Sequence, residues 1–332
     1  MKLHGKHYRV LDDDAARQYI NARATFTAWE QAQAVAANIR GGMHWKRRSA
    51  PNSSTEYLIR TSANAKRSET SLGPRSEKTE RIYGDFIQRK QDAADRLAGL
   101  KAAVEKAGAM NRALRVGQVP LMVVEILNRI AQSGLTDHFR VVGTHALYAY
   151  EAAAGIHFGT EALATMDIDL LWDVRKRIAF STALARVDGS MLGVLQRVDK
   201  SFRLRDDQKY TAVNNDGFEV DIIRREQTAD DPHPIKLSES EDDFWVAQAP
   251  RAQELSDAPP FSAIVVATNG AMARMDTIAP AAFVHFKRWM SALPGRESLK
   301  RRRDALQADV VEEILHAHLP HLDQIFPGPD EG

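Results

Sequence analysis

The stretch FRVVGTHALYAYEAAAGIHFGTEALATMDIDLLWD, residues 139–173, decides the fold. Its first apolar segment ends in Gly143-Thr144, a typical turn from a strand into a helix. Two aspartates, Asp167 and Asp169, then interrupt a second apolar segment. Side chains at positions i and i+2 of a strand point to the same face and lie about 7 Å apart. Because such carboxylates repel each other unless a cation lies between them, the pattern predicts a strand that binds a divalent cation.

A third aspartate occurs in a later predicted strand. Residues 198–226 are expected to form antiparallel strands, with Asn-Asp-Gly at 215–217 as a tight turn. In FEVDII, residues 218–223, alternation places Phe218, Val220 and Ile222 on one face and Asp221 on the other, with Glu219 and Ile223. A single aspartate in a strand often marks only a sheet edge. Combined with the earlier Asp-x-Asp strand, Asp221 is better explained as a third metal ligand.

The composition excludes several classes of protein. The chain has 332 residues, of which 44% are hydrophobic and 27% charged, as in soluble proteins large enough for two domains. It contains no cysteine, which excludes disulfides, thiolate catalysis and cysteine-bound zinc or iron–sulfur centres. No apolar run approaches the roughly 20 residues of a membrane span, and the first residues lack the apolar core of a signal peptide. We therefore expect a cytoplasmic protein.

The net charge of +1 conceals an uneven distribution. Residues 1–118 carry about 22 Lys and Arg against about 12 Asp and Glu, a net charge of about +10, and the remainder is correspondingly acidic. Within this basic part, GGMHWKRRSAPNSSTEYLIR predicts a hairpin on which Trp45 accompanies Lys46, Arg47 and Arg48. An aromatic ring among cations suits a nucleic-acid surface, RNA or tRNA included. Solvated helix faces and an exposed hairpin explain the same residues equally well.

Several segments resemble a known family. VVGTHALYAYE, TMDIDLL and GFEVDII resemble the three signature pieces of the DNA polymerase β type nucleotidyltransferase fold. GGMHWKR, YLIR, SLGPRSEKTE and FKRWMSALPGR are similar to a bacterial group of nucleotidyltransferase-fold proteins, distantly similar to AbiE-type abortive-infection toxins. The chain departs from the wider superfamily in two ways. Thr144 stands where Gly or Ser is preferred, and Gly143 lies further than usual from Asp167.

The resemblance implies an NTP substrate and Mg²⁺ or Mn²⁺ as cofactor. Nucleotidyl transfer is an in-line displacement at phosphorus in which paired divalent ions, held by carboxylates, stabilise the attacking and leaving oxygens. The implied catalytic residues and metal ligands are Asp167, Asp169 and Asp221, and Asp221 is also a candidate acceptor for the proton of the attacking hydroxyl. The implied nucleotide-binding residues are Gly143, Thr144, His145, Lys287, Lys300 and Arg303. An ordinary turn and a solvated basic helix face remain alternative explanations for these six.

The predicted fold is α/β (α+β), a nucleotidyltransferase-fold mixed sheet with flanking helices. We expect a basic helical and hairpin region at 1–118, the catalytic core at 119–228 and a mainly helical domain at 229–332. The predicted activity moves NMP from an NTP to an acceptor. The favoured acceptor is an RNA end, and a protein hydroxyl or a small molecule is the alternative. A non-catalytic module that binds a nucleotide or a partner protein is the competing hypothesis. The likeness to AbiE-type toxins further implies a toxin or defence role with an antitoxin or regulatory partner.

Overall fold

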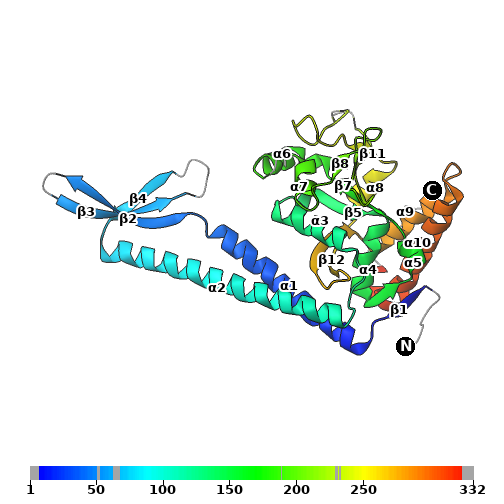
Figure 1. Cartoon of the computed structure of the whole chain (residues 1–332), viewed down its shortest axis with the longest axis horizontal. Coiled ribbons are helices and arrows are strands. Elements are labelled where there is room, and N and C mark those ends of the chain that lie inside the picture. Colours follow the sequence, from blue (N-terminus) through cyan, green and yellow to red (C-terminus); the bar gives the residue numbers. More distant parts are fainter. Residues whose placement is uncertain are drawn as a thin grey trace. The chain divides into compact units, whose positions relative to one another are not determined.

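The computed structural model describes residues 7–50, 53–62, 68–187, 189–228, 231 and 233–323. The chain divides into two compact units, one formed by Met1–Gln18 with Met110–Gly332 and the other by Tyr19–Ala109. Both contain helices and sheet, so the predicted mixture of α and β structure is confirmed (Figure 1). The functional boundaries expected at residues 118 and 228 stay a prediction. No helix in the described ranges is long and apolar enough to cross a lipid bilayer.

The smaller unit contains parts of two long helices and a three-stranded antiparallel sheet that connects them along the chain. Its elements are α1 (Asp13–Asn38), β2 (Gly42–Ala50), β3 (Ser53–Thr61), β4 (Glu69–Pro74) and α2 (Glu77–Ala113). The predicted hairpin is confirmed as β2–β3. The segment before α2 contains a third strand, β4, which pairs with β3. Because β4 is an edge strand with mostly exposed side chains, its sequence lacks the alternation that predicts a strand.

The larger unit is built on a mixed sheet. In spatial order its strands are β5 (Phe139–Val142), β7 (Asp167–Trp172), β10 (Glu219–Arg224), β9 (Thr211–Val213) and β8 (Arg203–Leu204), and β11 (Ala247–Gln248) also pairs with β10. Strands β7 and β10 are parallel, whereas β5–β7, β9–β10 and β8–β9 are antiparallel. The antiparallel strands expected around the Asn-Asp-Gly turn are confirmed.

Alternation along β7 and β10 decides which face carries the acids. Ile168 and Leu170 of β7, and Val220 and Ile222 of β10, are at most 1% exposed and belong to the main hydrophobic core. The helix α3 (Leu121–Gln132) buries its apolar side chains in the same core. Burial of one face fixes the strand register, because a shift of one residue would place the acidic side chains in this core. The carboxylates therefore lie on the opposite face.

The stretch between the turn and β7 forms a short layer of its own. A 3₁₀ turn at Gly143–Ala146 leads into α4 (Leu147–Ala154), β6 (Ile156–Phe158) and α5 (Thr160–Leu163). Strand β6 pairs with β1 (Tyr8–Val10) rather than with the main sheet. The extra length between Gly143 and Asp167 is thus accommodated outside the sheet that carries the acids.

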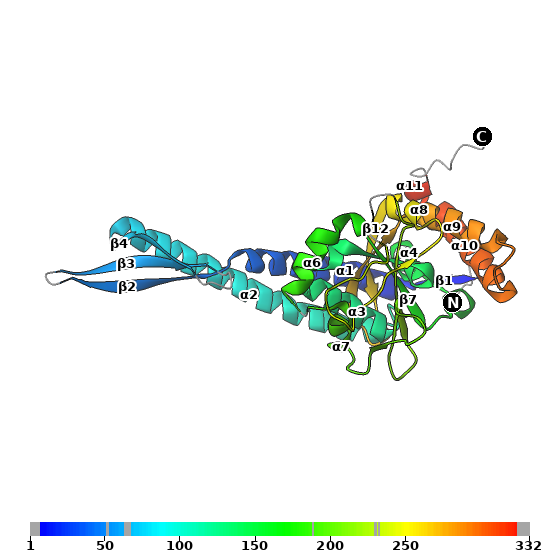
Figure 2. The same ribbon diagram turned by 90° about the horizontal axis from the view of Figure 1, so that it is seen from above.

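The C-terminal region combines a hairpin with two long helices. Strands β12 (Pro260–Val266) and β13 (Met272–Ile278) form an antiparallel pair that the sequence analysis does not predict, and Thr277 Oγ1 donates to the carbonyl oxygen of Val141 in β5 at 2.6 Å. The hairpin is followed by the helices α9 (Pro280–Ala292) and α10 (Ser298–His318), which lie side by side (Figures 1 and 2). The remaining helices are α6 (Arg177–Ala185), α7 (Met191–Gln196), α8 (Ala252–Asp257) and α11 (Pro320–Asp323).

Candidate active site

Three aspartates meet on the polar face of the sheet. Asp169 and Asp221 are directly opposite each other in the parallel pair β7–β10, and Asp167 precedes Asp169 by two residues on the same face. Each is partly buried, and one carboxylate oxygen from each lies within 4.8 Å of the others. The parity of the two strands and their pairing therefore create a concentrated cluster of negative charge, which we call the acidic triad.

The surroundings of the acidic triad raise the pKa of two of its carboxyl groups and donate hydrogen bonds to its carboxylate oxygens. Burial, followed by the charges of Asp167 and Asp221, raises the pKa of Asp169 to about 7. Burial also raises the pKa of Asp221, although the Thr211 hydroxyl donates to its Oδ1 at 2.5 Å and acts in the opposite direction. The Thr165 hydroxyl donates to Asp167. The raised pKa values thus reflect burial first and the mutual repulsion of the carboxylates second.

The Gly-Thr turn packs directly against the acidic triad. Gly143 has a φ of +68°, and a Cβ atom there would lie 2.1 Å from Oδ2 of Asp169. Glycine is therefore required both for this backbone conformation and for the close approach of a carboxylate. Thr144 is 6% exposed, and its Oγ1 accepts a hydrogen bond from Gln307 Nε2 at 3.1 Å.

His145 occupies the core rather than the polar face. It is 1% exposed, its ring packs beside Tyr148 and Phe218, and burial lowers its pKa to about 4. A neutral, packed imidazole is the common state of a buried histidine. Any contact of this residue with a nucleotide would have to come from its backbone N–H.

A cavity of about 370 Å³ opens beside the acidic triad, and both charged and apolar residues line it. The predicted residues that line it are Gly143, Thr144, Asp167, Asp169, Lys287, Lys300 and Arg303. Its apolar lining residues are Ile223, Ala249, Pro250, Leu255, Phe286, Trp289, Met290 and Leu293. Arg296 adds a further cation to the lining. We call this cavity the cleft.

The cations of the cleft come from α9, α10 and the turn between them. Lys287 is 4% exposed, and its Nζ donates to Oδ1 of Asp304 at 2.8 Å. Arg296 donates to the other oxygen of the same carboxylate. Burial lowers the pKa of Lys287, and the charge and hydrogen bond of Asp304 oppose this effect. Lys300 is exposed at the cleft.

Two side chains of α10 tie this helix to the other walls of the cleft. Arg303 donates to the carbonyl oxygen of Ala164 at 2.9 Å. Gln307, which is fully buried, donates to the carbonyl oxygen of Ala162 at 2.7 Å as well as to Thr144. The helix α10 thus holds both the turn at Gly143–Ala146 and the segment that leads into β7.

These elements are the ones that a family comparison recognises. A family model described as nucleotidyltransferase matches residues 121–325, more than half of the chain. The chain belongs to the nucleotidyltransferase family. No curated protein and no solved structure matches it. The prediction of a nucleotidyltransferase enzyme is confirmed by this match. The more distant similarity to AbiE-type toxins stays a prediction.

The acidic triad suits the metal chemistry of a nucleotidyltransferase. Hard divalent ions such as Mg²⁺ and Mn²⁺ bind carboxylate oxygens, and paired ions in such sites lie about 3.5 to 4 Å apart. Oxygens within 4.8 Å of one another are close enough to share such ions. The charges of Asp167 and Asp221 also disfavour the ionised form of Asp169, and a bound cation would relieve this repulsion. Asp167, Asp169 and Asp221 are therefore the residues of this nucleotidyltransferase that could hold the metal.

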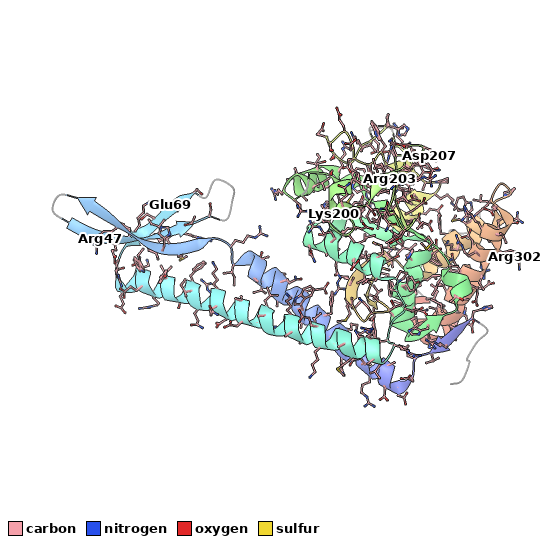
Figure 3. The ribbon with its side chains drawn as sticks, in the orientation of Figure 1. Arg47, Glu69, Lys200, Arg203, Asp207 and Arg302 are labelled. Carbon is pink, nitrogen blue, oxygen red and sulfur yellow. The ribbon has the colours of Figure 1, made fainter. Side chains whose placement is uncertain are left out.

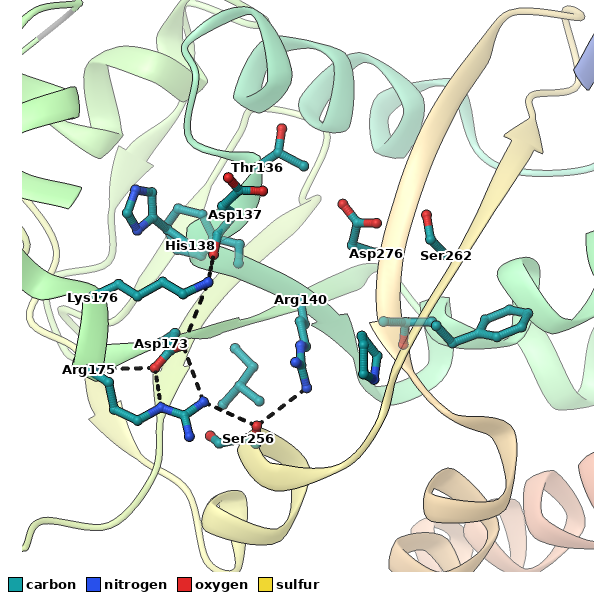
Figure 4. A pocket seen from close by; sticks show the side chains of 15 residues that line it. Thr136, Asp137, His138, Arg140, Asp173, Arg175, Lys176, Ser256, Ser262 and Asp276 are labelled. Atoms are coloured by element: carbon teal, nitrogen blue, oxygen red, sulfur yellow. Dashed lines mark hydrogen bonds and ion pairs between the residues drawn. The ribbon is translucent and has the colours of Figure 1, made fainter. Parts of the chain in front are cut away.

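A second cavity, also of about 370 Å³, lies toward the other end of β7 (Figure 4). As in the cleft, several of its cations donate to groups of the protein itself. Arg140 donates to the carbonyl oxygen of Ala258 at 2.9 Å, and Lys176 donates to that of Asp137 at 2.7 Å. Size does not separate the two cavities, but Asp167 and Asp169 line the first and not the second. We therefore assign the reaction of the nucleotidyltransferase to the cleft.

The basic residues of the smaller unit have distinct environments. Lys46 Nζ pairs with Glu69 at 2.7 Å, and Arg47 is exposed (Figure 3). Trp45 is half-buried, with its ring 5.8 Å from that of Tyr83 and under the guanidinium of Arg75. The indole therefore attaches the sheet to α2 rather than forming an open stacking platform. The side chain of Arg48 lies outside the described part of the structure.

Sequence reasoning misses five polar residues around the cleft: Thr165, Thr211, Arg296, Asp304 and Gln307. Thr165 lies two residues before Asp167, a spacing that could have indicated a shared face. Thr211 is found only through the pairing of β9 with β10. Asp304 follows a run of basic residues that suggests a solvated surface, and only the packing of α10 on α9 reveals that it is buried.

Proposed function

We propose that this nucleotidyltransferase uses Mg²⁺ to transfer NMP from an NTP to the end of an RNA, tRNA included. The carrying observation is that one cleft is lined by Asp167 and Asp169 of the acidic triad, by a group of cations and by apolar side chains. These three surfaces match the metal, the triphosphate and the nucleoside of an NTP, in that order.

The charges of the cleft suggest how an NTP lies. The triphosphate faces Lys287, Arg296 and Arg303, because phosphate oxygens bind ammonium and guanidinium groups strongly. The nucleoside lies against the apolar residues, among which Phe286 and Trp289 offer aromatic surface. The hydroxyl of Thr144, which accepts from Gln307, can donate its own hydrogen to a phosphate oxygen. This orientation directs the α-phosphorus toward the acidic triad.

The transfer step balances without another reactant. The acceptor oxygen forms a bond to the α-phosphorus, the bond from this phosphorus to the bridging oxygen breaks, and pyrophosphate leaves. Asp221 accepts the proton of the acceptor hydroxyl, a role favoured by its raised pKa and by the orientation that Thr211 imposes. Divalent ions bound by the triad would neutralise charge on the attacking and leaving oxygens. Asp167 and Asp169 position them.

The charge of the smaller unit supports RNA as the acceptor. Residues 19–109 carry about 16 Lys and Arg against about 9 Asp and Glu, a surplus that attracts phosphate backbones. Lys46 and Arg47 are exposed on its sheet. A toxin role, with an antitoxin protein as partner, remains a prediction from the resemblance.

The acceptor is tested by incubating the purified enzyme with each α-labelled NTP, Mg²⁺ and either total cellular RNA or an RNA-free lysate. We expect label in RNA, lost when EDTA is added and absent from the Asp167→Asn variant. Label in protein or in a small molecule would replace RNA as the acceptor. No transfer to any acceptor, despite binding of NTP, would contradict the proposed reaction.

A further inference from the structure

Asp304 accepts hydrogen bonds from two cations that line the cleft, Lys287 and Arg296. Its side chain is fully buried, and its two oxygens accept from Lys287 Nζ at 2.8 Å and from Arg296 Nε. A carboxylate that binds one cation through each oxygen fixes the positions of both. The close hydrogen-bonded pairing also compensates the cost of burying these charges.

Lys287 is attracted by a second carboxylate as well. Lys287 and Asp169 line the same cleft, and each stabilises the charged form of the other. The attraction of Lys287 to Asp304 is the stronger one and includes a hydrogen bond. Lys287 thus lines the cleft together with Asp169, but its hydrogen bond is to Asp304.

An ammonium group and a divalent ion use the same carboxylate oxygens. A lysine paired with Asp169 would neutralise part of the triad and obstruct the metal. We propose that Asp304 is a positioning residue that holds Lys287 away from Asp169, so that the triad stays open to a divalent ion and the ammonium faces the triphosphate. The proposal rests on the metal site proposed above, and its test separates the two.

The test measures Mn²⁺ binding to the nucleotide-free enzyme by electron paramagnetic resonance. Binding by the wild type and its loss in Asp169→Asn would establish the metal site itself. Asp304→Asn removes a charge with little change of shape, and we expect its Mn²⁺ affinity to fall by about tenfold or more, since the released ammonium competes for the triad. The matched control is Asp309→Asn. Asp309 lies on the same helix as Asp304 and forms an exposed ion pair with Arg288 of α9, so this variant should bind Mn²⁺ as the wild type does.

A double variant distinguishes lysine capture from general damage to the site. Asp304→Asn combined with Lys287→Met removes the competing ammonium, so Mn²⁺ affinity should return to within about threefold of the wild type. A structural role alone would leave the double variant as weak as the single one. Unchanged Mn²⁺ affinity in Asp304→Asn, or no recovery in the double variant, would overturn the proposal.

Lys287→Met alone keeps the test decisive if Asp304→Asn does not fold. Asp304 then retains Arg296 as its partner. If Asp304 already keeps Lys287 off the triad, the loss of this lysine should change Mn²⁺ affinity by less than about threefold. A tenfold or larger gain in affinity would show that Lys287 competes with the metal in the native enzyme and would refute the proposed role of Asp304.

Discussion

Asp169→Asn should stabilise the metal-free enzyme at neutral pH while it abolishes transfer. Folding raises the pKa of Asp169 from 3.8 to about 7 through burial and the neighbouring charges of Asp167 and Asp221. Between these values the folded state binds a proton that the unfolded state has lost. The wild type is therefore most stable in this respect below pH 4 and loses stability as the pH rises to 7. Asparagine has no carboxyl proton to lose, so its contribution to stability does not change over this pH range.

The structure sets an upper limit on the gain. Each pKa unit corresponds to about 1.4 kcal/mol, so the full shift of Asp169 amounts to about 4 kcal/mol. Because the side chain is partly exposed and solvent screens its charge, we expect a gain of about 1 to 3 kcal/mol in the free energy of unfolding at pH 8. The gain should disappear toward pH 4, where both proteins carry a neutral side chain at this position.

Urea unfolding in EDTA at pH 4.5, 6 and 8 measures this difference. The control is Asp173→Asn, just beyond the other end of β7, where Arg175 outweighs burial and lowers the pKa of the carboxyl. This control should lose stability at pH 8, the opposite sign. Added Mg²⁺ should stabilise the wild type and leave Asp169→Asn unaffected. Equal destabilisation of both variants at pH 8 would refute the account of the triad.

Three further predictions concern the reaction, the turn and the RNA surface. Asp221→Ala should lower kcat by orders of magnitude with little change in NTP affinity, because its contact with the reacting hydroxyl forms mainly in the transition state; a pure rise in KM would argue against this role. Gly143→Ala should displace the Asp169 carboxylate and weaken Mn²⁺ binding, since its Cβ would lie 2.1 Å from Oδ2, and unchanged affinity would contradict the close approach. Charge reversal of Lys46 and Arg47 should weaken RNA binding and reduce its salt dependence without affecting NTP binding, whereas salt-independent RNA binding would favour another acceptor.

The acidic triad could be predicted because its pattern is local. Asp167 and Asp169 interrupt one apolar strand with the right parity, and Asp221 does so in another. Their convergence needs only that the two strands be neighbours. The reason for Gly143 is less accessible from the sequence, since its close contact is with the Asp169 carboxylate of an adjacent strand.

The remaining features depend on packing that the sequence pattern does not encode. Strand β4 is polar on most of its length, so alternation gives no signal. The pairing of Lys287 with Asp304 joins residues on two helices whose relative rotation sets which side chains meet. The side chain of His145 is buried, whereas its place beside the turn suggested a nucleotide-binding role.

The most direct test of metal-dependent NMP transfer to RNA follows the α- and γ-phosphates of the NTP in one reaction. Wild-type enzyme and Asp167→Asn are supplied with RNA and with NTP labelled at either the α- or the γ-phosphate, over a range of Mg²⁺ concentrations. We expect α-label to enter the RNA while γ-label leaves as pyrophosphate, only with divalent metal and only with the wild type. Transfer of γ-label, metal-independent transfer or full activity of Asp167→Asn would contradict the proposed reaction.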